Sequence, residues 1–353
     1  MTNPSAEAPF FQTMPYALYT DPQVYREEKQ KIFSRSWNFV GMSSLVAKPG
    51  DFYTCEVAGQ PIIVTHGQDG VIRAFYNVCA HRATKVEKEE FGSKKILMCS
   101  YHGWTYKLDG GLNKTPNFKD CSELCTGAFD LKPIRLEIES SFMFVNLDDQ
   151  APALLDTYRD FFEDIRVFSF MGNLKKIEVK KRVIGCNWKV FIDNFLECDH
   201  CPIAHPGFVS TLDMKKYHII NGDYCNIQGT GLKAGRTDLQ TAEVQEGRFY
   251  WLWPNTMVTV YPGPGNISTI QMLPIDHETT MGVYTFYLEG DEPTAEQKQL
   301  MAFADQVRQE DVELVELAQV GYRSSAFDRG ICSPTEHGVY HFAQLVQSAL
   351  GPR

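Results

Sequence analysis

The sequence lacks any apolar run that approaches the roughly 18 residues of a membrane-spanning helix. Residues 1–9 are polar and contain neither the basic nor the apolar region of a secretion signal. Internal repeats and low-complexity tracts are absent as well. These absences argue against a membrane, secreted or repeat protein, and we expect a cytoplasmic localisation.

Basic residues are also scarce, since 34 Lys and Arg stand against 44 Asp and Glu and the formal net charge is -10. Binding to phosphate backbones requires clustered cations. The charge therefore argues against a nucleic-acid partner, whereas a small cationic molecule or a protein partner is compatible with it.

Ten cysteines are present in the 353 residues. A small secreted domain would use them for disulfides, but we expect an enzyme-sized chain without a secretion signal to keep its thiols reduced. Metal binding is therefore the first function to consider for them.

The hydrophobic pattern predicts two domains after a short helical segment at residues 1–37. Residues 38–150 contain short apolar runs broken by glycine, which is typical of small antiparallel sheets. Residues 151–353 are expected to be α+β, with helices over 188–201 and 294–320 and strands between 218 and 288.

Two Cys/His pairs lie in the first domain, Cys79-Ala80-His81 and Cys99-Ser100-Tyr101-His102, separated by the residues 82–98. Each pair follows a predicted strand, so two short loops can face each other across one metal centre. Two thiolates on one iron and two imidazoles on the other define a 2Fe-2S Rieske cluster, which accepts and passes on one electron. A structural zinc with the same four ligands is the alternative, although zinc fingers place their histidine pair on a helix.

A second group of metal-binding residues lies in the second domain. We expect Asn194, Glu197 and His200 to form a row along the predicted helix 188–201, which Pro202 ends before His205. Two histidines need a carboxylate to complete the facial triad that leaves sites open on Fe(II).

The carboxylate is expected from the helix 294–320. Asp311 lies in the middle of an apolar stripe on this helix, and a buried carboxylate is costly unless it is paired or bound to metal. We therefore predict Asp311 as the third ligand. The stripe is formed by Leu300, Ala304, Val307, Leu314 and Ala318, while Asp305, Glu310, Glu313 and Glu316 are expected to point away. The alternatives are that the histidines are ordinary core or surface residues, or that Cys198, His200 and Cys201 belong to a zinc site.

From about Ile32 to Phe342 these motifs resemble the Rieske oxygenase α-subunit family. The cluster ligands of the family match Cys79, His81, Cys99 and His102; its iron-site helix matches Asn194–His200 followed by His205; and its carboxylate segment resembles Gln309–Leu314. Ala83 stands where the family often has Gly, but Ala83 is not a ligand. Glu197 stands where most relatives have Asp, and in this context the sequence looks like the carnitine, choline and glycine betaine monooxygenase branch.

The resemblance implies a small all-β Rieske domain placed before a helix-grip-like catalytic domain with an antiparallel sheet, and an N-terminal segment that packs on the catalytic domain. It implies a head-to-tail homotrimer in which Glu197 connects a cluster histidine to an iron-bound histidine of the neighbouring subunit, with Asn194 also in the catalytic site. Electrons from NADH or NADPH would arrive through a separate flavin and iron–sulfur reductase, and O2 would be the co-substrate. The sequence contains no glycine-rich nucleotide fingerprint of its own.

Aromatic residues of the second domain are candidates for substrate binding. Phe249, Trp251 and Trp253 alternate along one predicted strand, and Tyr261 follows on the next. Such rings can hold a quaternary ammonium group through cation–π attraction, although aromatic residues in a sheet are more often core. We select Trp251, Trp253 and Tyr261.

Three functions are compatible with these features. The first is hydroxylation of a small quaternary ammonium compound, with C–N cleavage or alcohol oxidation. The second is ring hydroxylation of an aromatic acid, and the third is an electron carrier without catalysis. The complete set of predicted iron ligands argues against the third.

Overall fold

The structure is a computed structural model that describes residues 10–116, 118 and 127–352. The chain divides into two compact units, one formed by residues 33–154 and the other by residues 1–32 together with 155–353. The expected α+β class is confirmed: a small all-β unit precedes a larger unit built on an antiparallel sheet. None of the helices in the described residues is both long enough and apolar enough to cross a membrane.

The smaller unit contains a seven-stranded antiparallel sheet in the order β2-β11-β10-β5-β4-β3-β6, and a three-stranded sheet in the order β7-β8-β9. A core of aliphatic and aromatic residues that includes Phe75 and Leu97 also contains the thiols of Cys79 and Cys99. The strands are β2 (Asn38–Met42), β3 (Asp51–Val57), β4 (Gln60–His66), β5 (Ile72–Tyr76), β6 (Phe91–Ser93), β7 (Leu97–Met98), β8 (Thr105–Tyr106), β9 (Leu112–Lys114), β10 (Pro133–Glu139) and β11 (Phe142–Asn146).

The larger unit is built on a seven-stranded antiparallel sheet in the order β12-β18-β17-β16-β15-β14-β13. The inner strands β16 and β18 are mostly buried and rich in β-branched and aromatic residues, which suits a sheet that is covered on both faces. Its strands are β12 (Leu174–Ile184), β13 (His218–Asn221), β14 (Cys225–Gly231), β15 (Glu246–Leu252), β16 (Thr256–Val260), β17 (Asn266–Pro274) and β18 (Thr280–Glu289).

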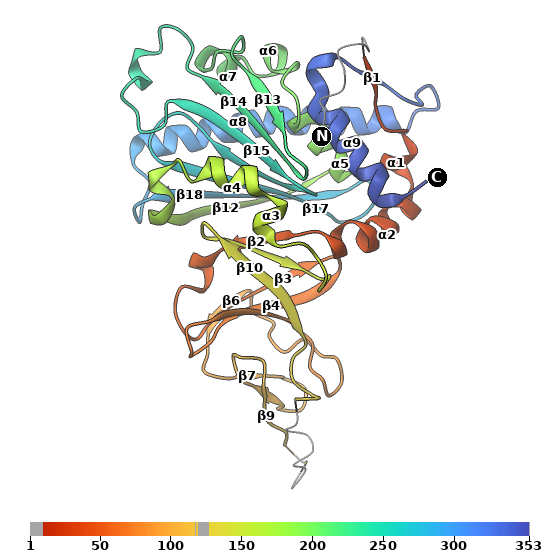
Figure 1. Ribbon diagram of the computed structural model, residues 1–353, viewed down its shortest axis with the longest axis vertical. Helices are drawn as coiled ribbons and strands as arrows, with labels where there is room; N and C mark the ends of the chain where they lie inside the picture. The colour runs from red at the N-terminus through yellow and green to blue at the C-terminus, as the bar shows by residue number, and fades with distance from the viewer. Residues whose placement is uncertain (1–9, 117, 119–126, 353) are drawn as a thin grey trace. The chain divides into compact units, whose positions relative to one another are not determined.

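Helices cover both faces of this sheet. The short helix α4 (Arg159–Ile165) lies on one face, where Phe161 contacts Tyr250 of β15 with ring centroids 5.1 Å apart (Figure 1). The long helix α8 (Ala295–Tyr322) runs across the opposite face (Figure 1). The other helices of this unit are α1 (Ala17–Thr20), α2 (Pro22–Lys31), α5 (Trp188–Phe195), α6 (Cys201–Ala204), α7 (Pro206–Thr211) and α9 (His337–Leu350), and the division of the sequence into units falls within α3 (Leu154–Thr157).

The N-terminal helices are held to α5 by buried polar contacts. Glu28 of α2 and Lys189 of α5 form an ion pair whose side chains are both fully buried, and the Trp188 indole N–H donates to the same carboxylate at 2.9 Å. The Tyr19 hydroxyl donates to Asp193 at 2.5 Å. The fully buried charges of Glu28 and Lys189 must compensate each other, because an isolated buried charge is strongly unfavourable.

The apolar stripe on α8 differs from the predicted one in its second half. Leu300, Ala304 and Val307 are buried as expected, but Leu314 is 38% exposed and Ala318 is also exposed. Val312, Val315 and Gln319 are buried in their place.

Candidate metal centres and active-site pocket

Two loops of the smaller unit have the same backbone structure. In the first, the Cys79 N–H donates to the Thr84 carbonyl at 2.9 Å, and the Cys79 carbonyl accepts from Ala83 at 3.0 Å. In the second, Cys99 makes the corresponding bonds to Trp104 at 2.8 Å and to Gly103 at 3.0 Å. The turn requires a left-handed residue four positions after each cysteine, and Ala83 (φ 58°) and Gly103 (φ 72°) provide it.

These loops bring the four predicted cluster ligands together. The imidazoles of His81 and His102 lie with ring centroids 4.5 Å apart, and the Trp104 ring stacks on His81 at 4.9 Å. Both thiols are buried, each cysteine being 2% exposed. Burial raises the pKa of Cys99, so a thiolate at this position needs a neighbouring cation.

One buried atom of this group indicates what is bound there. The Nδ1 of His102 is buried without a hydrogen-bond partner among the described residues, whereas buried polar atoms normally have one. A metal ion would satisfy this nitrogen as well as the thiols. The donor set therefore fits a metal cluster with sulfur ligands on one side and nitrogen ligands on the other.

The second candidate centre begins where α5 ends, earlier than the sequence predicted. The helix stops at Phe195 and not at residue 201, and Glu197 lies in the following turn. The Glu197 carboxylate accepts from the backbone N–H groups of Asp199 and His200 and so replaces helical hydrogen bonds. Pro202 lies in the first turn of α6, where its missing N–H costs nothing, so it starts a helix and does not end one.

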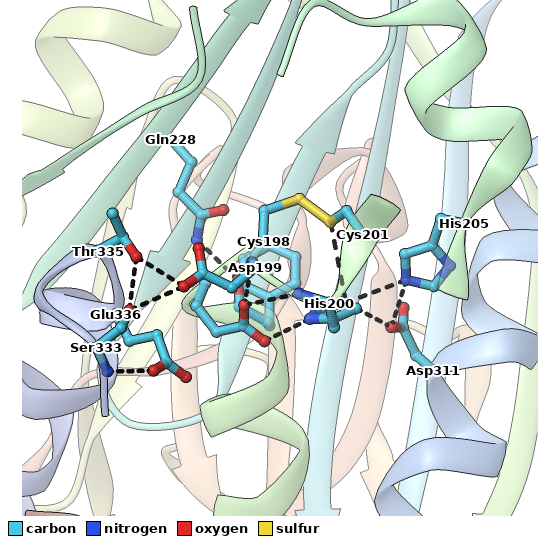
Figure 2. A network of polar contacts seen from close by, with 12 residues as sticks. Cys198, Asp199, His200, Cys201, His205, Gln228, Asp311, Ser333, Thr335 and Glu336 are labelled. Carbon is cyan, nitrogen blue, oxygen red and sulfur yellow. Dashed lines mark hydrogen bonds and ion pairs between the residues drawn. A yellow bond between two sulfur atoms is a disulfide. The ribbon is translucent and has the colours of Figure 1, made fainter. Parts of the chain in front are cut away.

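The three predicted iron ligands converge. The Nε2 atoms of His200 and His205 are 3.1 Å apart, and the Asp311 Oδ1 lies 3.5 Å from the first and 3.0 Å from the second. Figure 2 shows Asp311 reaching the two imidazoles from α8. Three ligands at right angles with bonds of about 2.1 Å have donor atoms about 3 Å apart, so the observed triangle fits a facial arrangement on one metal ion.

A carboxylate holds the outer nitrogen of each imidazole. Glu197 Oε1 bonds His200 Nδ1, and Glu310 Oε2 lies 2.7 Å from His205 Nδ1. The prediction that Glu310 points away from the site was wrong, because α8 carries it to the far side of His205. A carboxylate on Nδ1 keeps the proton there and directs the Nε2 lone pair inward, as metal sites require.

His200, His205 and Asp311 shift one another's pKa values. Burial lowers the pKa of His200, but the hydrogen bonds to Asp311 and Glu197 outweigh it and raise this pKa to about 9. Burial raises the pKa of Asp311, and the two imidazoles outweigh it so that the pKa is lowered. Without metal, protons on the imidazoles therefore balance the carboxylate, and a divalent cation can take their place.

The cysteines beside the site form a disulfide between Cys198 and Cys201, whose Cα atoms are 5.0 Å apart. The expectation that all thiols are reduced is wrong for this pair, because the turn after α5 brings residues three apart within bonding distance. The Cys201 sulfur and one imidazole nitrogen each of His200 and His205 lie within 4.8 Å of one another. A sulfur in a disulfide is no thiolate, however, and Asp311 is the better third donor.

A pocket with about 570 Å³ of empty space, part of it open to solvent, lies over the three converging groups. Asn194, Glu197 and Tyr261 line it, as do residues that the sequence analysis did not select. Arg308 could have been selected as the one basic residue on the buried stripe of α8. The unselected lining residues include Phe208, Tyr217, Gln228, Phe249, Thr259 and Arg308.

Trp251 and Trp253 do not line this pocket. Both are buried against Phe342 of α9, with ring centroids 5.4 and 6.1 Å from it. Phe249 and Trp251 do share one face of β15, but the pocket covers that face only near Phe249 and α9 covers it farther along. The structure thus gives a core role to the two tryptophans selected for substrate binding.

Comparison with known families agrees with both centres. Residues 36–130 match the Rieske [2Fe-2S] domain. Residues 171–351 match the ring hydroxylating alpha subunit (catalytic domain). The match to the cluster domain favours the Rieske centre over the structural zinc considered from the sequence.

Two curated relatives align over nearly the whole chain. The carnitine monooxygenase oxygenase subunit of Acinetobacter baumannii is 34% identical, with 95% of this chain and 94% of the relative covered. The chloroplastic choline monooxygenase of Arabidopsis thaliana is 30% identical, with 96% of this chain and 83% of the relative covered.

Solved structures show the same architecture. The quaternary ammonium Rieske monooxygenase CntA in complex with L-carnitine superposes with a TM-score of 0.87 and 32% identity, covering 98% of this chain and 97% of CntA. Naphthalene 1,2-dioxygenase bound to indole superposes with a TM-score of 0.79 and 22% identity, and it shares the fold. This alignment covers 96% of this chain and 92% of the dioxygenase chain. With both domain families matched in order and relatives aligned from end to end, the chain belongs to the Rieske non-haem iron oxygenase α-subunit family.

Proposed function

We propose that this chain is the oxygenase component of a monooxygenase that hydroxylates a small quaternary ammonium compound, with C–N cleavage or alcohol oxidation as the outcome. The observation that carries the proposal is the convergence of His200, His205 and Asp311 at one pocket, in a chain 34% identical to carnitine monooxygenase oxygenase subunits. We infer the substrate class from the names of the relatives, and we assign substrate binding to the pocket.

The residues divide into two metal sites. Cys79, His81, Cys99 and His102 would hold the 2Fe-2S cluster in a Rieske domain of residues 38–150, and His200, His205 and Asp311 would hold Fe(II) in a catalytic domain of residues 151–353, with residues 1–37 as an N-terminal segment that would pack on it. When bound, the cluster supplies single electrons and the iron activates O2. This chain's own residues orient the two iron-site imidazoles through Glu197 and Glu310, while Asn194 lines the pocket beside them.

Electrons must come from outside the chain. We infer a separate flavin and iron–sulfur reductase that oxidises NADH or NADPH, because the sequence has no nucleotide fingerprint. A head-to-tail homotrimer in the cytoplasm is the expected assembly. An assembly of more than one subunit is supported by the structure of a quaternary ammonium Rieske monooxygenase that reveals inter-subunit electron transfer (TM-score 0.88, 32% identity), and Glu197 is the residue we assign to that path.

The pocket chemistry suits a trimethylammonium group. Phe208, Phe249 and Tyr261 present aromatic rings to the pocket, and Phe249 and Tyr261 lie 5.5 Å apart at nearly a right angle. Each such ring can attract a quaternary ammonium group by about 0.5 to 2 kcal/mol. The CntA complexes contain L-carnitine and gamma-butyrobetaine, both of this class.

The test is substrate-dependent NADH oxidation, measured with the iron-loaded protein and a generic Rieske reductase. The panel contains trimethylammonium compounds and aromatic acids, with product analysis for each. We expect coupled O2 consumption and hydroxylated product with at least one trimethylammonium compound. Turnover of aromatic acids alone would replace the proposal with ring hydroxylation.

A further inference from the structure

Arg308 is a charged side chain buried at the pocket. It is 6% exposed, lines the pocket and lies one helical turn before Asp311 on α8. Its guanidinium lies over the rings of Phe286 at 4.4 Å and Tyr284 at 5.1 Å. Burial lowers the pKa of Arg308, but an arginine remains charged in proteins.

The partners of Arg308 leave one donor unused. Its Nη1 donates to Asp305 at 3.2 Å and its Nη2 donates to the Ser268 hydroxyl. Its Nε is buried and has no partner in the described part of the chain. Asp305 also bonds Lys180, which lies 3.3 Å from Glu178 as well.

A second unused polar group belongs to the same part of the pocket wall. Thr259 lines the pocket, and its buried Oγ1 has no partner among the residues described. Thr259 of β16 lies directly opposite Ser268 of β17, the residue that accepts from Arg308. Directly opposed residues of an antiparallel pair lie on the same face about 5 Å apart. Arg308 and Thr259 are therefore neighbours at one end of a largely aromatic pocket.

A structural role for Arg308 explains only part of this arrangement. Bonds to Asp305 and Ser268 account for the two terminal nitrogens, but not for the unpaired Nε or for Thr259. Buried groups without partners are costly and rare in folded proteins. Two of them on residues that line one pocket indicate that a ligand supplies their partner.

The polarity of the unused groups identifies what the ligand must offer. The Nε–H of an arginine can only donate a hydrogen bond, and the hydroxyl of Thr259 can donate one as well, so the ligand must present acceptor oxygens. An arginine beside a hydroxyl is well suited to a carboxylate, whose oxygens accept charge-assisted hydrogen bonds.

We propose that Arg308 and Thr259 form an anion subsite that binds the carboxylate of the substrate, so the substrate is a trimethylammonium carboxylate and not a trimethylammonium alcohol. This inference rests on the proposed function and narrows its substrate class. One helical turn, about 5 Å, separates Arg308 from Asp311 along α8. A carboxylate held by Arg308 therefore leaves the remainder of a short ligand within the pocket, beside the iron ligands and the aromatic rings.

The experiment uses a matched pair of probes, gamma-butyrobetaine and its methyl ester, which differ only in the negative charge. Binding to the full-length, iron-loaded protein is measured by calorimetry, and turnover is measured with the reductase. Arg308→Met removes the charge and keeps the length, Arg308→Lys keeps the charge, and Thr259→Val removes the hydroxyl. Arg182→Met is the control, because Arg182 contacts Gln309 of the same helix on the exposed side.

We expect the unaltered protein to bind the acid at least tenfold more tightly than the ester. Arg308→Met should weaken binding of the acid roughly 10- to 100-fold, mainly as an increase in KM, and leave the ester within about threefold. Arg308→Lys should retain part of the preference, Thr259→Val should lose about three- to tenfold, and the control should lose nothing. The cluster absorbance and Tm verify that each variant is folded.

Other outcomes are equally decisive. Equal losses for acid and ester in Arg308→Met would assign Arg308 a purely structural role, and equal binding of both probes by the unaltered protein would refute a carboxylate subsite. Arg308-dependent binding of the acid without any turnover would leave the subsite intact and refute the proposed monooxygenase function instead.

Discussion

The two outer carboxylates of the iron site provide the sharpest test of how electrons reach it. Glu197 and Glu310 hold the Nδ1 atoms of His200 and His205 in the same manner. If both only orient an imidazole, then Glu197→Gln and Glu310→Gln should have similar effects, typically 10- to 100-fold in metal affinity or activity. If Glu197 also lies on the electron path from a neighbouring cluster, its variant should lose much more electron transfer than iron.

The structure indicates what glutamine does at each position. One oxygen of the Glu197 carboxylate bonds His200 Nδ1, and the other accepts hydrogen bonds from the backbone N–H groups of Asp199 and His200. Glutamine has one acceptor oxygen, so it can satisfy either the imidazole or the turn. Each lost charge-assisted hydrogen bond costs about 1.5 to 3 kcal/mol, which corresponds to a loss of roughly 10- to 150-fold. Glu310 bonds Gln306 and His205, so Glu310→Gln is a matched control.

The assay is stopped-flow reoxidation of the reduced cluster after addition of O2 and substrate, with iron content measured for each preparation. At full iron occupancy we expect slow reoxidation in Glu197→Gln, and reoxidation within about tenfold of the unaltered rate in Glu310→Gln. Equal rates in the two variants would remove the special role of Glu197. Loss of iron from Glu197→Gln alone would make Glu197 a necessary support of the ligand set and leave the electron path unassigned.

Three further predictions follow from the contacts described. Asp311→Ala should lose the mononuclear iron and all turnover but keep the cluster spectrum, whereas Glu316→Ala should keep both; the reverse pattern in iron analysis would contradict the ligand assignment. Cys99→Ala should abolish the brown visible absorption of the cluster, and a colourless unaltered protein with stoichiometric zinc would refute the cluster itself. Glu28→Gln should lower the free energy of unfolding by about 3 to 5 kcal/mol, because it removes the negative charge of the buried ion pair with Lys189. A denaturant midpoint that does not change would show that this pair is not desolvated.

The sequence predicted which residues converge at the candidate metal centres better than it predicted the elements that carry them. Asp311 was selected from an apolar stripe of which Leu314 and Ala318 turned out to be exposed, because the first half of the stripe was sufficient to fix the phase of α8. The end of α5 was placed six residues too late, since periodicity does not register the Glu197 side chain that replaces helical hydrogen bonds. A hydrogen bond from a side chain to the backbone depends on individual atoms, so the pattern of apolar residues does not show where it ends a helix.

Substrate-binding residues were harder to find for a different reason. Alternation along β15 correctly grouped Phe249 and Trp251 on one face, but it cannot tell which part of that face lies beneath the pocket and which lies beneath α9. That depends on where α9, almost 100 residues later in the chain, packs on the sheet. Arg308 lies on the buried side of α8 as well, where a basic residue is as unusual as the carboxylate of Asp311.

The nitrogen atoms that the imidazoles of the two centres offer to a metal differ. His102 presents an Nδ1 that has no partner among the described residues, whereas the iron-site imidazoles have Nδ1 bound by Glu197 and Glu310 and present Nε2 inward. A carboxylate behind an imidazole makes it a stronger donor to its metal, and such donors favour a higher metal charge. The carboxylates behind His200 and His205 therefore suit an iron that would give electron density to O2.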